Sequence, residues 1–373
     1  MNRSTIPLGR ILGIPIGLDY SWFLIFALLT WTLATSYYPT EFGSWPVAQY
    51  WIVGAATAIL MFVSVLLHEL GHSVVAMRYK IPVRSITLFI FSGVAQIGAE
   101  PPSAIAEFWI ALAGPATSFA LAILFGLLQP IVGALAPLLA LAKYLAYING
   151  SLALFNLIPG FPLDGGRVFR AIVWGITHSL HRATLIAANL GRFIAYLFIL
   201  LGVWQMFTGH FGNGLWIAFL GWFLESAAAS QVQQQTIHDL LAGHRVSDTM
   251  RRDYSAVSPG ATLEQLVNEH ILGSGRRSLV VEQNDTVAGL LTLHHIKEIP
   301  RADWSTTTAA QAMIPVGQMK RIRPDAELVD ALGEMDRDGV NQLPVMVGDQ
   351  IQGVLGRDDV ISLLRTLTEF SRQ

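Results

Sequence analysis

The motif His68-Glu69-Leu70-Gly71-His72 combines residue types and a spacing that suit hydrolysis at a metal ion. Histidines four residues apart lie on one face of a helix, about 6 Å apart along its axis, so both imidazoles can reach one ion. Neutral imidazole is a good ligand for zinc, and zinc lowers the pKa of a bound water. Glu69 lies beside that position and can accept the proton of the water. The motif therefore predicts a zinc centre that attacks a carbonyl carbon.

A catalytic zinc ion uses a third protein ligand, and the chain has no cysteine to provide one. The segment from Asn156 to Gly166 (NLIPGFPLDGG) contains Asp164, the only acidic residue between Glu107 and Glu225. Its prolines and glycines break a helix and allow the carboxylate to point inward. An N-cap role at a helix starting near Gly165 is the alternative. Beside a metal motif in an apolar segment, the role of a metal ligand is favoured.

The composition indicates a membrane protein with a soluble tail. Hydrophobic residues make up 53% of the chain and charged residues only 13%, against about 25% charged residues in soluble domains. The long uncharged runs end near residue 228, and residues 237–373 have an ordinary soluble composition. The net charge of −2 argues against nucleic acid as a direct partner. The first residues do not form a signal peptide, so the first apolar run is expected to be a retained membrane helix.

Six apolar segments approach the roughly 20 residues that a membrane-spanning helix needs: 19–38, 50–77, 105–128, 135–157, 184–207 and 211–229. Residues 167–178 are too few to span, and they are expected to continue the fourth helix or to lie at the interface. Lysine and arginine in alternate loops predict that both termini and the soluble tail lie in the cytosol, at a plasma or inner membrane. Lys143 and Arg192 have no explanation in this pattern.

Residues 84–98 (RSITLFIFSGVAQIG) are apolar and rich in β-branched and aromatic residues, but they are too few to span a membrane. They predict a strand or hairpin that dips into the membrane under the cover of surrounding protein.

The soluble tail contains an internal repeat of about 64 residues. Met250 aligns with Met313, Pro259 with Pro324, Leu263 with Leu328 and Gly289 with Gly353. Each repeat reads as strand, helix, strand, turn, strand and helix, which predicts a tandem α/β module.

The HExxH motif and the NxxPxxPLDGG-type segment together resemble the site-2 protease family of intramembrane zinc metalloproteases. The resemblance implies that His68, His72 and Asp164 are the zinc ligands and that Glu69 is the catalytic base. It also implies that Asn156 assists near the substrate or the oxyanion.

In the same family a membrane-dipping strand pairs with the unwound substrate, which here implies substrate contacts at Ser92, Gly93 and Val94. Gly114-Pro115-Ala116 resembles a packing element of that family. The implied substrate is a single-span membrane protein, such as a membrane-tethered regulator that regulated intramembrane proteolysis releases.

Residues 247–299 and 309–366 resemble a pair of CBS domains, placed after a membrane core at 1–229 and a linker at 230–246. CBS pairs bind adenine nucleotides through a G-x-x-[ST]-x-x-D pattern, which here is divided between the repeats. Thr292 lies in a copy that ends in His295, and Asp359 ends a copy with Gly356 in place of the hydroxyl residue. The two are expected to serve one ATP or AMP in one cleft. A purely structural module that forms a homodimer is the alternative.

The expected fold is thus a polytopic α-helical membrane protein in the lipid bilayer, with about six transmembrane helices and a membrane-dipping β segment, followed by an α/β tandem CBS module. A CBS-regulated transporter and a catalytically inactive membrane scaffold are the alternative functions. Neither needs a glutamate between two histidines together with a lone aspartate on a proline-broken segment.

Overall fold

The computed structural model describes residues 5–89, 93–97, 100–283 and 286–370. The chain divides into two compact units, Met1–Gln233 and Gln234–Gln373. Each unit is described by itself.

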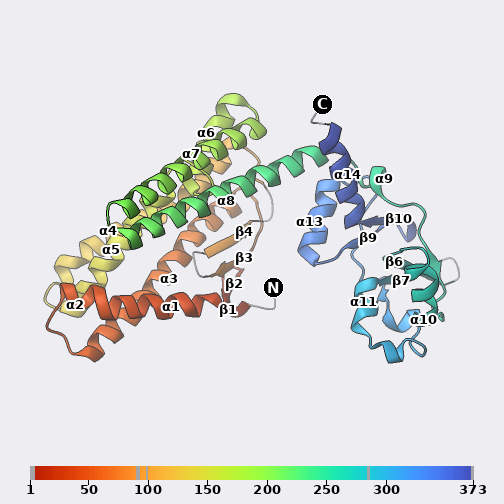
Figure 1. The fold of residues 1–373 in the computed structure, drawn as a ribbon, viewed down its shortest axis with the longest axis horizontal. Coiled ribbons are helices and arrows are strands. Elements are labelled where there is room, and N and C mark those ends of the chain that lie inside the picture. Colours follow the sequence, from red (N-terminus) through yellow and green to blue (C-terminus); the bar gives the residue numbers. More distant parts are fainter. Residues whose placement is uncertain (1–4, 90–92, 98–99, 284–285, 371–373) are drawn as a thin grey trace. The chain divides into compact units, whose positions relative to one another are not determined.

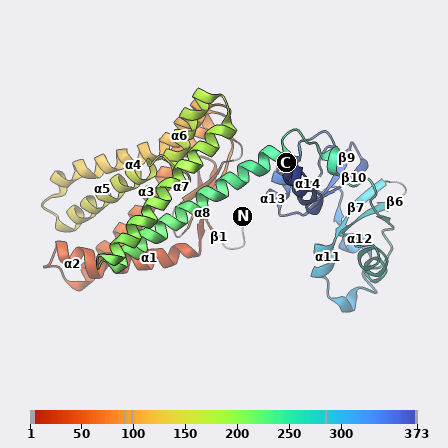
Figure 2. The same ribbon diagram turned by 45° about the horizontal axis from the view of Figure 1, so that its top comes forward.

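Helices dominate the first unit (Figures 1 and 2). Within the described residues, five of them are long and apolar enough to cross a membrane: α3 Val47–Arg78, α4 Ala104–Val132, α5 Ala136–Asn156, α7 Leu180–Phe207 and α8 Phe211–Leu241. The expected first span is built from three consecutive elements: α1 Ser21–Thr32, the π-helical turn η1 Leu33–Tyr37 and α2 Tyr38–Glu41. Residues 167–177 belong to a separate helix, α6 Asp164–Thr177, with His178 as its C-cap, and do not continue the fourth span.

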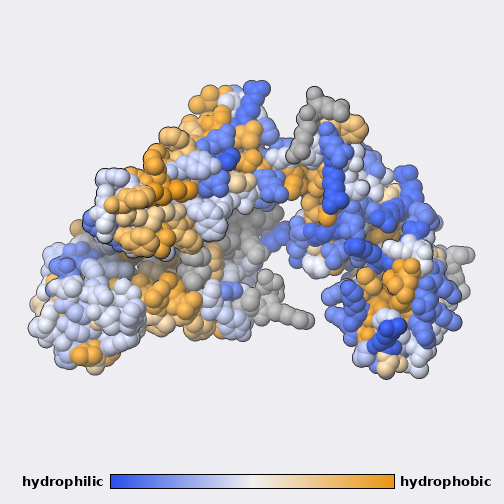
Figure 3. All heavy atoms as spheres, viewed as in Figure 1, coloured by the Kyte–Doolittle hydropathy of each residue, from blue (hydrophilic) through white to orange (hydrophobic). Residues whose placement is uncertain are grey.

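Many large apolar side chains on these helices point outward. Phe207 is 87% exposed, Ile131 76% and Leu127 66%. A soluble unit rarely leaves so many such residues in water. Orange atoms gather along the helices of the first unit in Figure 3, whereas blue atoms dominate the visible face of the second. This distribution fits a first unit that faces lipid and a second unit that faces water.

Two charged residues that the sequence left unexplained have partners in the first unit. Arg192 on α7 donates through Nε to Glu225 on α8, at 3.1 Å. The Lys143 ammonium lies over the ring of Phe42, 5.8 Å from its centroid. Charges inside membrane helices are costly unless they are paired, and both contacts reduce that cost.

A four-stranded sheet packs against the second half of α3. Its strands run in the order β1 Thr5–Ile11, β2 Ile14–Asp19, β3 Val83–Leu88 and β4 Gly93–Ile97. β2 and β3 are parallel, and the other two pairs are antiparallel. The expected hairpin at 84–98 is therefore present as β3 and β4. β4 is an edge strand among the described residues.

The hairpin of β1 and β2 was not predicted, because the N-terminal residues were interpreted only as the start of a membrane chain. Leu12 and Gly13 both have positive φ, of 51° and 81°. Two consecutive residues of this kind form the tight turn that antiparallel strands prefer. Gly13 between two apolar runs was the signal in the sequence.

The second unit contains the two repeats. It begins at Gln234, so the last residues of α8, up to Leu241, belong to it. The first repeat comprises α9 Val246–Thr249, β5 Ala256–Val257, α10 Leu263–Leu266, η2 Val267–Leu272, β6 Ser278–Gln283, β7 Thr286–Thr292 and α11 Leu293–Glu298. After the turn η3 Arg301–Asp303, the second repeat comprises α12 Ala309–Ala312, β8 Ile314–Pro315, α13 Leu328–Asp338, β9 Gln342–Val347, β10 Gln350–Gly356 and α14 Arg357–Phe370.

The two repeats exchange their first extended segments. β8 of the second repeat pairs with β7 of the first, and Arg251 of the first repeat bridges Val354 of the second. Leu241, at the end of α8, is fully buried in the core of the second repeat. Part of the expected linker at 230–246 is therefore helical and contributes to this core.

Candidate functional site

α3 carries the two histidines and the glutamate of the HExxH motif. His68, Glu69 and His72 are 4%, 9% and 5% exposed, so all three ionisable groups are buried. Burial of such groups in an apolar helix is costly unless other groups compensate for it.

Three candidate ligand atoms converge at one point. Asp164 Oδ2 lies 3.1 Å from His68 Nε2 and 3.2 Å from His72 Nε2, and the two Nε2 atoms are 3.2 Å apart. Ligand atoms about 2.0–2.1 Å from a tetrahedral zinc ion lie about 3.3 Å from one another. The triangle formed by His68, His72 and Asp164 therefore has the size of one face of a zinc tetrahedron.

The hydrogen bonds of the opposite ring nitrogens show that the two histidines fit a cation at this point. His72 Nδ1 donates to the carbonyl oxygen of Ile110 at 2.7 Å, so in the neutral ring Nε2 carries a lone pair. His68 Nδ1 lies 2.9 Å from Ser118 Oγ, and its Nε2 carries a lone pair in the tautomer in which Nδ1 donates to that hydroxyl. Two lone pairs and a carboxylate oxygen repel one another at these distances. A cation bound between them removes the repulsion, so these residues fit a zinc ion.

Gly114 on α4 makes room for both imidazoles. A Cβ atom there would lie 2.6 Å from His68 Nε2 and closer still to His72 Nε2. The Gly-Pro element predicted to serve packing therefore leaves space for the candidate metal centre.

Asp164 reaches the histidines because the chain makes a tight loop after α5. It is the first residue of α6, and Leu163 occupies the N-cap position. The N-cap alternative for Asp164 is therefore wrong. Cβ atoms on Gly165 and Gly166 would overlap backbone atoms of Leu157 and Gly160, so the loop needs both glycines.

Glu69 lies against the start of β4. A Cβ atom on Gly93 would lie 2.6 Å from Glu69 Cγ. Val94 pairs with Thr87 in the register of β3 and β4, and Ser92 lies outside the described residues. Asn156 is the last residue of α5 and is half-buried.

Sequence reasoning missed the residues of α4 that surround this centre. Ile110 and Ser118 bond to the histidines, and Glu107 bonds to Arg170 of the helix that Asp164 begins. Their spacing along one helical face, together with a glutamate in an apolar segment, was the signal in the sequence.

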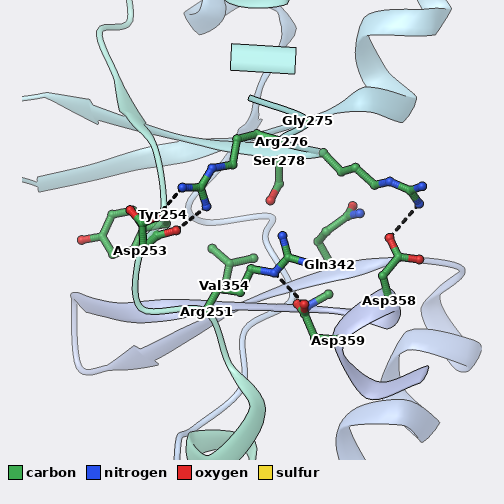
Figure 4. Close-up of a pocket in the computed structure, with 12 residues that line it drawn as sticks. Arg251, Asp253, Tyr254, Gly275, Arg276, Ser278, Gln342, Val354, Asp358 and Asp359 are labelled. Carbon is green, nitrogen blue, oxygen red and sulfur yellow. Dashed lines mark hydrogen bonds and ion pairs between the residues drawn. The ribbon is translucent and has the colours of Figure 1, made fainter. Parts of the chain in front are cut away.

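The second unit places Thr292 and Asp359 in different cavities. Asp359 lines a cavity of about 80 Å³. Figure 4 shows its carboxylate paired with Arg251, and two further ion pairs line the same cavity, Arg276 with Asp253 and Arg277 with Asp358. Asp359 also accepts a hydrogen bond from the Gly356 amide at 2.9 Å.

Thr292 lines a larger cavity of about 330 Å³, together with His295, Lys320 and Asp338. Thr292 Oγ1 and His295 Nδ1 are 2.7 Å apart, so the histidine that replaces the pattern's aspartate bonds to the hydroxyl. Burial and the neighbouring His294 lower the pKa of His295. Small-molecule sites usually enclose about 300–1,000 Å³. Of these two cavities, that of Thr292 reaches this range and that of Asp359 does not.

A buried HExxH helix whose histidines meet a carboxylate from a separate helix defines a metallopeptidase class of site. Comparison of the chain with models of known protein families agrees with this class. Residues 56–135 and 129–201 match the family model for Peptidase family M50, and residues 246–301 and 312–366 match the CBS domain model.

Relatives named as zinc metalloproteases match nearly the whole chain. Rip3 of Mycobacterium tuberculosis is 35% identical over 367 residues, which is 97% of this chain and 93% of Rip3. The protein sll0528 of Synechocystis is 34% identical over 375 residues, which is 98% of this chain and 97% of that protein. The solved site-2 protease from Methanocaldococcus jannaschii is 30% identical, with a TM-score of 0.42, and the match covers 61% of this chain and 95% of that one.

The chain therefore belongs to Peptidase family M50, the zinc metalloproteases of site-2 protease type, and carries a tandem CBS module. It is a multi-pass membrane protein. The family membership agrees with the predicted protease and not with a transporter.

Proposed function

We propose that this protein is an intramembrane zinc endopeptidase that hydrolyses a peptide bond within or near the membrane segment of a single-span protein. One observation carries the proposal: the Nε2 atoms of His68 and His72, on a membrane-length helix, and one carboxylate oxygen of Asp164 lie within 3.2 Å of one another, and Glu69 lies next to His68 on that helix. An inactive scaffold would have no need to maintain this costly arrangement.

His68, His72 and Asp164 would hold the zinc ion, which when bound polarises a carbonyl group and makes water a better nucleophile. Glu69 takes a proton from the attacking water and passes it to the amine nitrogen of the leaving peptide. Gly93 limits the space available to the Glu69 side chain and so keeps the carboxylate near the ligands. Asn156 donates to a substrate carbonyl from the end of α5.

The substrate segment must be extended at the cut, because a helix shields its own peptide bonds. β4 is a suitable template, because it is an edge strand that begins at Gly93, next to Glu69. A substrate strand added there would form backbone hydrogen bonds with the residues around Ser92, Gly93 and Val94. This register brings an extended peptide bond to the metal centre.

The lysine and arginine residues favour a cytosolic position for both termini and for the CBS module. In this orientation Asp164 lies toward the cytosolic end of the membrane core, and the product is released into the cytosol. The function is then regulated intramembrane proteolysis of a membrane-tethered regulator.

The test is cleavage of a panel of single-span substrates by the full chain in detergent, with Glu69→Gln as the variant. Activity should fall by at least about 10³-fold, because the proton acceptor is lost. Zinc content should stay at one per chain, because Glu69 is not a ligand. An unchanged rate in the zinc-loaded variant contradicts the mechanism, and a wild-type chain that binds no zinc contradicts the site.

A second proposal concerns the CBS module, which we infer to bind an adenine nucleotide that controls access to the metal centre. Three arginines line the Asp359 cavity and can bind phosphates if they exchange their present carboxylate partners. The Thr292 cavity has the volume for a nucleotide, but its pattern ends in His295 in place of aspartate. We also propose that two copies of the chain form a homodimer through their CBS modules.

A further inference from the structure

α4 contributes no ligand, yet one of its faces contacts both histidines of the candidate metal centre and the helix that begins at Asp164. Glu107, Ile110, Gly114 and Ser118 lie at positions i, i+3, i+7 and i+11, and all are buried. Residues at this spacing form a single stripe along a helix. Ser118 bonds to His68 Nδ1, the Ile110 carbonyl to His72 Nδ1, and Gly114 leaves space for both rings. Three of the four residues thus act directly on the two histidines.

The fourth residue of the stripe, Glu107, acts on the helix that carries the third ligand. Arg170 on α6 donates to Glu107 Oε1 through Nε at 2.6 Å and also through an Nη2 group. The side chain of Glu107 is fully buried, and that of Arg170 is 8% exposed. Asp164 and Arg170 lie on the same short helix, so this ion pair connects the Asp164 helix to α4.

Arg170 also stabilises the loop that precedes Asp164. Its guanidinium lies over the ring of Phe161, 5.3 Å from the centroid. Arg167 Nε lies 4.0 Å from Glu107 Oε1, and the carboxylates of both Glu107 and Asp164 act on the Arg167 charge. Charges of opposite sign therefore face each other from Asp164 through Arg167 and Glu107 to Arg170.

We propose that Glu107 is a positioning residue of the metal centre, which fixes the α6 helix to α4 through Arg170 and thereby sets the place of Asp164 Oδ2. A metal site functions only if each ligand is held within about 0.5 Å of its proper position. Asp164 follows a helix break, so its own helix does not fix it to α3. A buried ion pair adds little net stability, but separating its two charges leaves each without a partner or water, so positions of α6 that separate Arg170 from Glu107 are disfavoured. The inference rests on the proposed function only in that the centre binds a metal.

The experiment measures metal binding to the full chain in detergent, without any substrate. The Kd for Zn²⁺ is obtained by competition with a chelator, and the absorption spectrum of the Co²⁺-loaded protein reports the coordination geometry. Glu107→Gln should weaken Zn²⁺ binding about 10–100-fold, the range for partners of metal ligands. Its Co²⁺ spectrum should shift, because Asp164 no longer holds its position.

Glu225→Gln is the matched control, because it breaks an interhelical arginine pair of the first unit away from the metal centre, that of Arg192. It should leave the Kd for Zn²⁺ and the Co²⁺ spectrum unchanged, even if it lowers thermal stability by the same amount. A purely structural role for Glu107 would make the two variants alike.

Should Glu107→Gln fail to fold, the double variant Glu107→Gln/Arg170→Met replaces it, because it leaves no unpaired Arg170 charge. It should fold and still bind Zn²⁺ at least about tenfold more weakly. Wild-type Zn²⁺ affinity and an unchanged Co²⁺ spectrum in either folded variant overturn the inference. Failure of the wild-type chain to bind Zn²⁺ overturns the proposed function instead, so the two failures are distinguishable.

Discussion

The ion pairs at the candidate metal centre and those of the CBS module differ most in their exposure to water. In the membrane unit Glu107 is fully buried against Arg170, and Asp164 contacts two buried histidines. In the CBS module Arg251 is 53% exposed beside Asp359, and Arg277 is 63% exposed beside Asp358. Exposed pairs contribute little and exchange partners readily, whereas breaking a buried pair leaves a charge without solvent. The groups around the candidate metal centre are therefore held in one fixed geometry, whereas the exposed pairs of the module can exchange partners.

Loss of a metal ligand should give the largest effect in this comparison. Asp164→Ala removes one of the three donors, so zinc should be lost and cleavage should fall by more than about 10³-fold. Asp358→Ala, in an exposed pair of the module, should change neither quantity. Metal analysis and the cleavage assay check both variants, and stoichiometric zinc in Asp164→Ala would contradict the ligand set.

Gly114→Ala tests whether zinc binding needs the space that Gly114 leaves for the two imidazole rings. The new Cβ overlaps both Nε2 atoms, so zinc affinity should fall by more than about 100-fold. Gly126→Ala in the same helix meets nothing within 4 Å and is the control. Chelator competition measures both, and equal affinities would show that α4 can move away from the histidines.

Gly93→Ala should separate the base from the ligands. Glu69 must move to avoid the new Cβ, so kcat should fall about 10–100-fold while zinc content stays at the wild-type value. Gly17→Ala is the control. Gly17 lies in the same sheet, and the new Cβ would meet its nearest atoms at 3.7 Å, an ordinary contact distance, so this variant should keep full activity. If zinc content falls with kcat, the strand supports the metal centre and not the base.

The CBS module should show smaller effects, because its charges are already in water. Asp359→Asn should weaken binding of ATP or AMP to the full chain about tenfold, if the ribose binds there. Thr292→Ala makes the same test for the larger cavity, and Asp349→Asn in an exposed turn is the control. Calorimetric titration decides between the cavities. Unchanged affinity in both variants would place the nucleotide outside both cavities, and absence of binding to the wild-type chain would leave the module a structural one.

The smallest effect concerns pH. Burial and His294 hold the pKa of His295 below its ordinary value of 6.5, although Glu298 acts in the opposite direction. The unfolded chain therefore binds a proton more readily than the folded one, and the second unit should lose stability as the pH falls below about 6.5. His295→Asn should reduce that loss. Amide exchange in β7 and α11, compared with the wild type at pH 7 and pH 5, measures the difference.

Much of the candidate site follows from local sequence. The HExxH spacing fixes His68, Glu69 and His72 on one turn of a helix, whatever surrounds it. A lone aspartate after two prolines indicates a ligand, and the repeat in the tail is visible as aligned methionine, proline and glycine positions. The sequence did not predict the separate α6 helix, the N-terminal hairpin or the two distinct cavities. Each of them depends on contacts that local sequence patterns do not specify.

The sequence by itself therefore determined the chemistry of this protein: the donor types, their spacing on one helix, the apolar lengths of the spans and the duplicated α/β tail. Only the tertiary structure decided how those groups meet. It brings Asp164 to His68 and His72 across more than ninety residues, places Gly114 beneath both rings and couples Glu107 to Arg170. The physical reason is that helical periodicity fixes neighbours only within a few turns, whereas contacts between helices depend on packing of the whole unit.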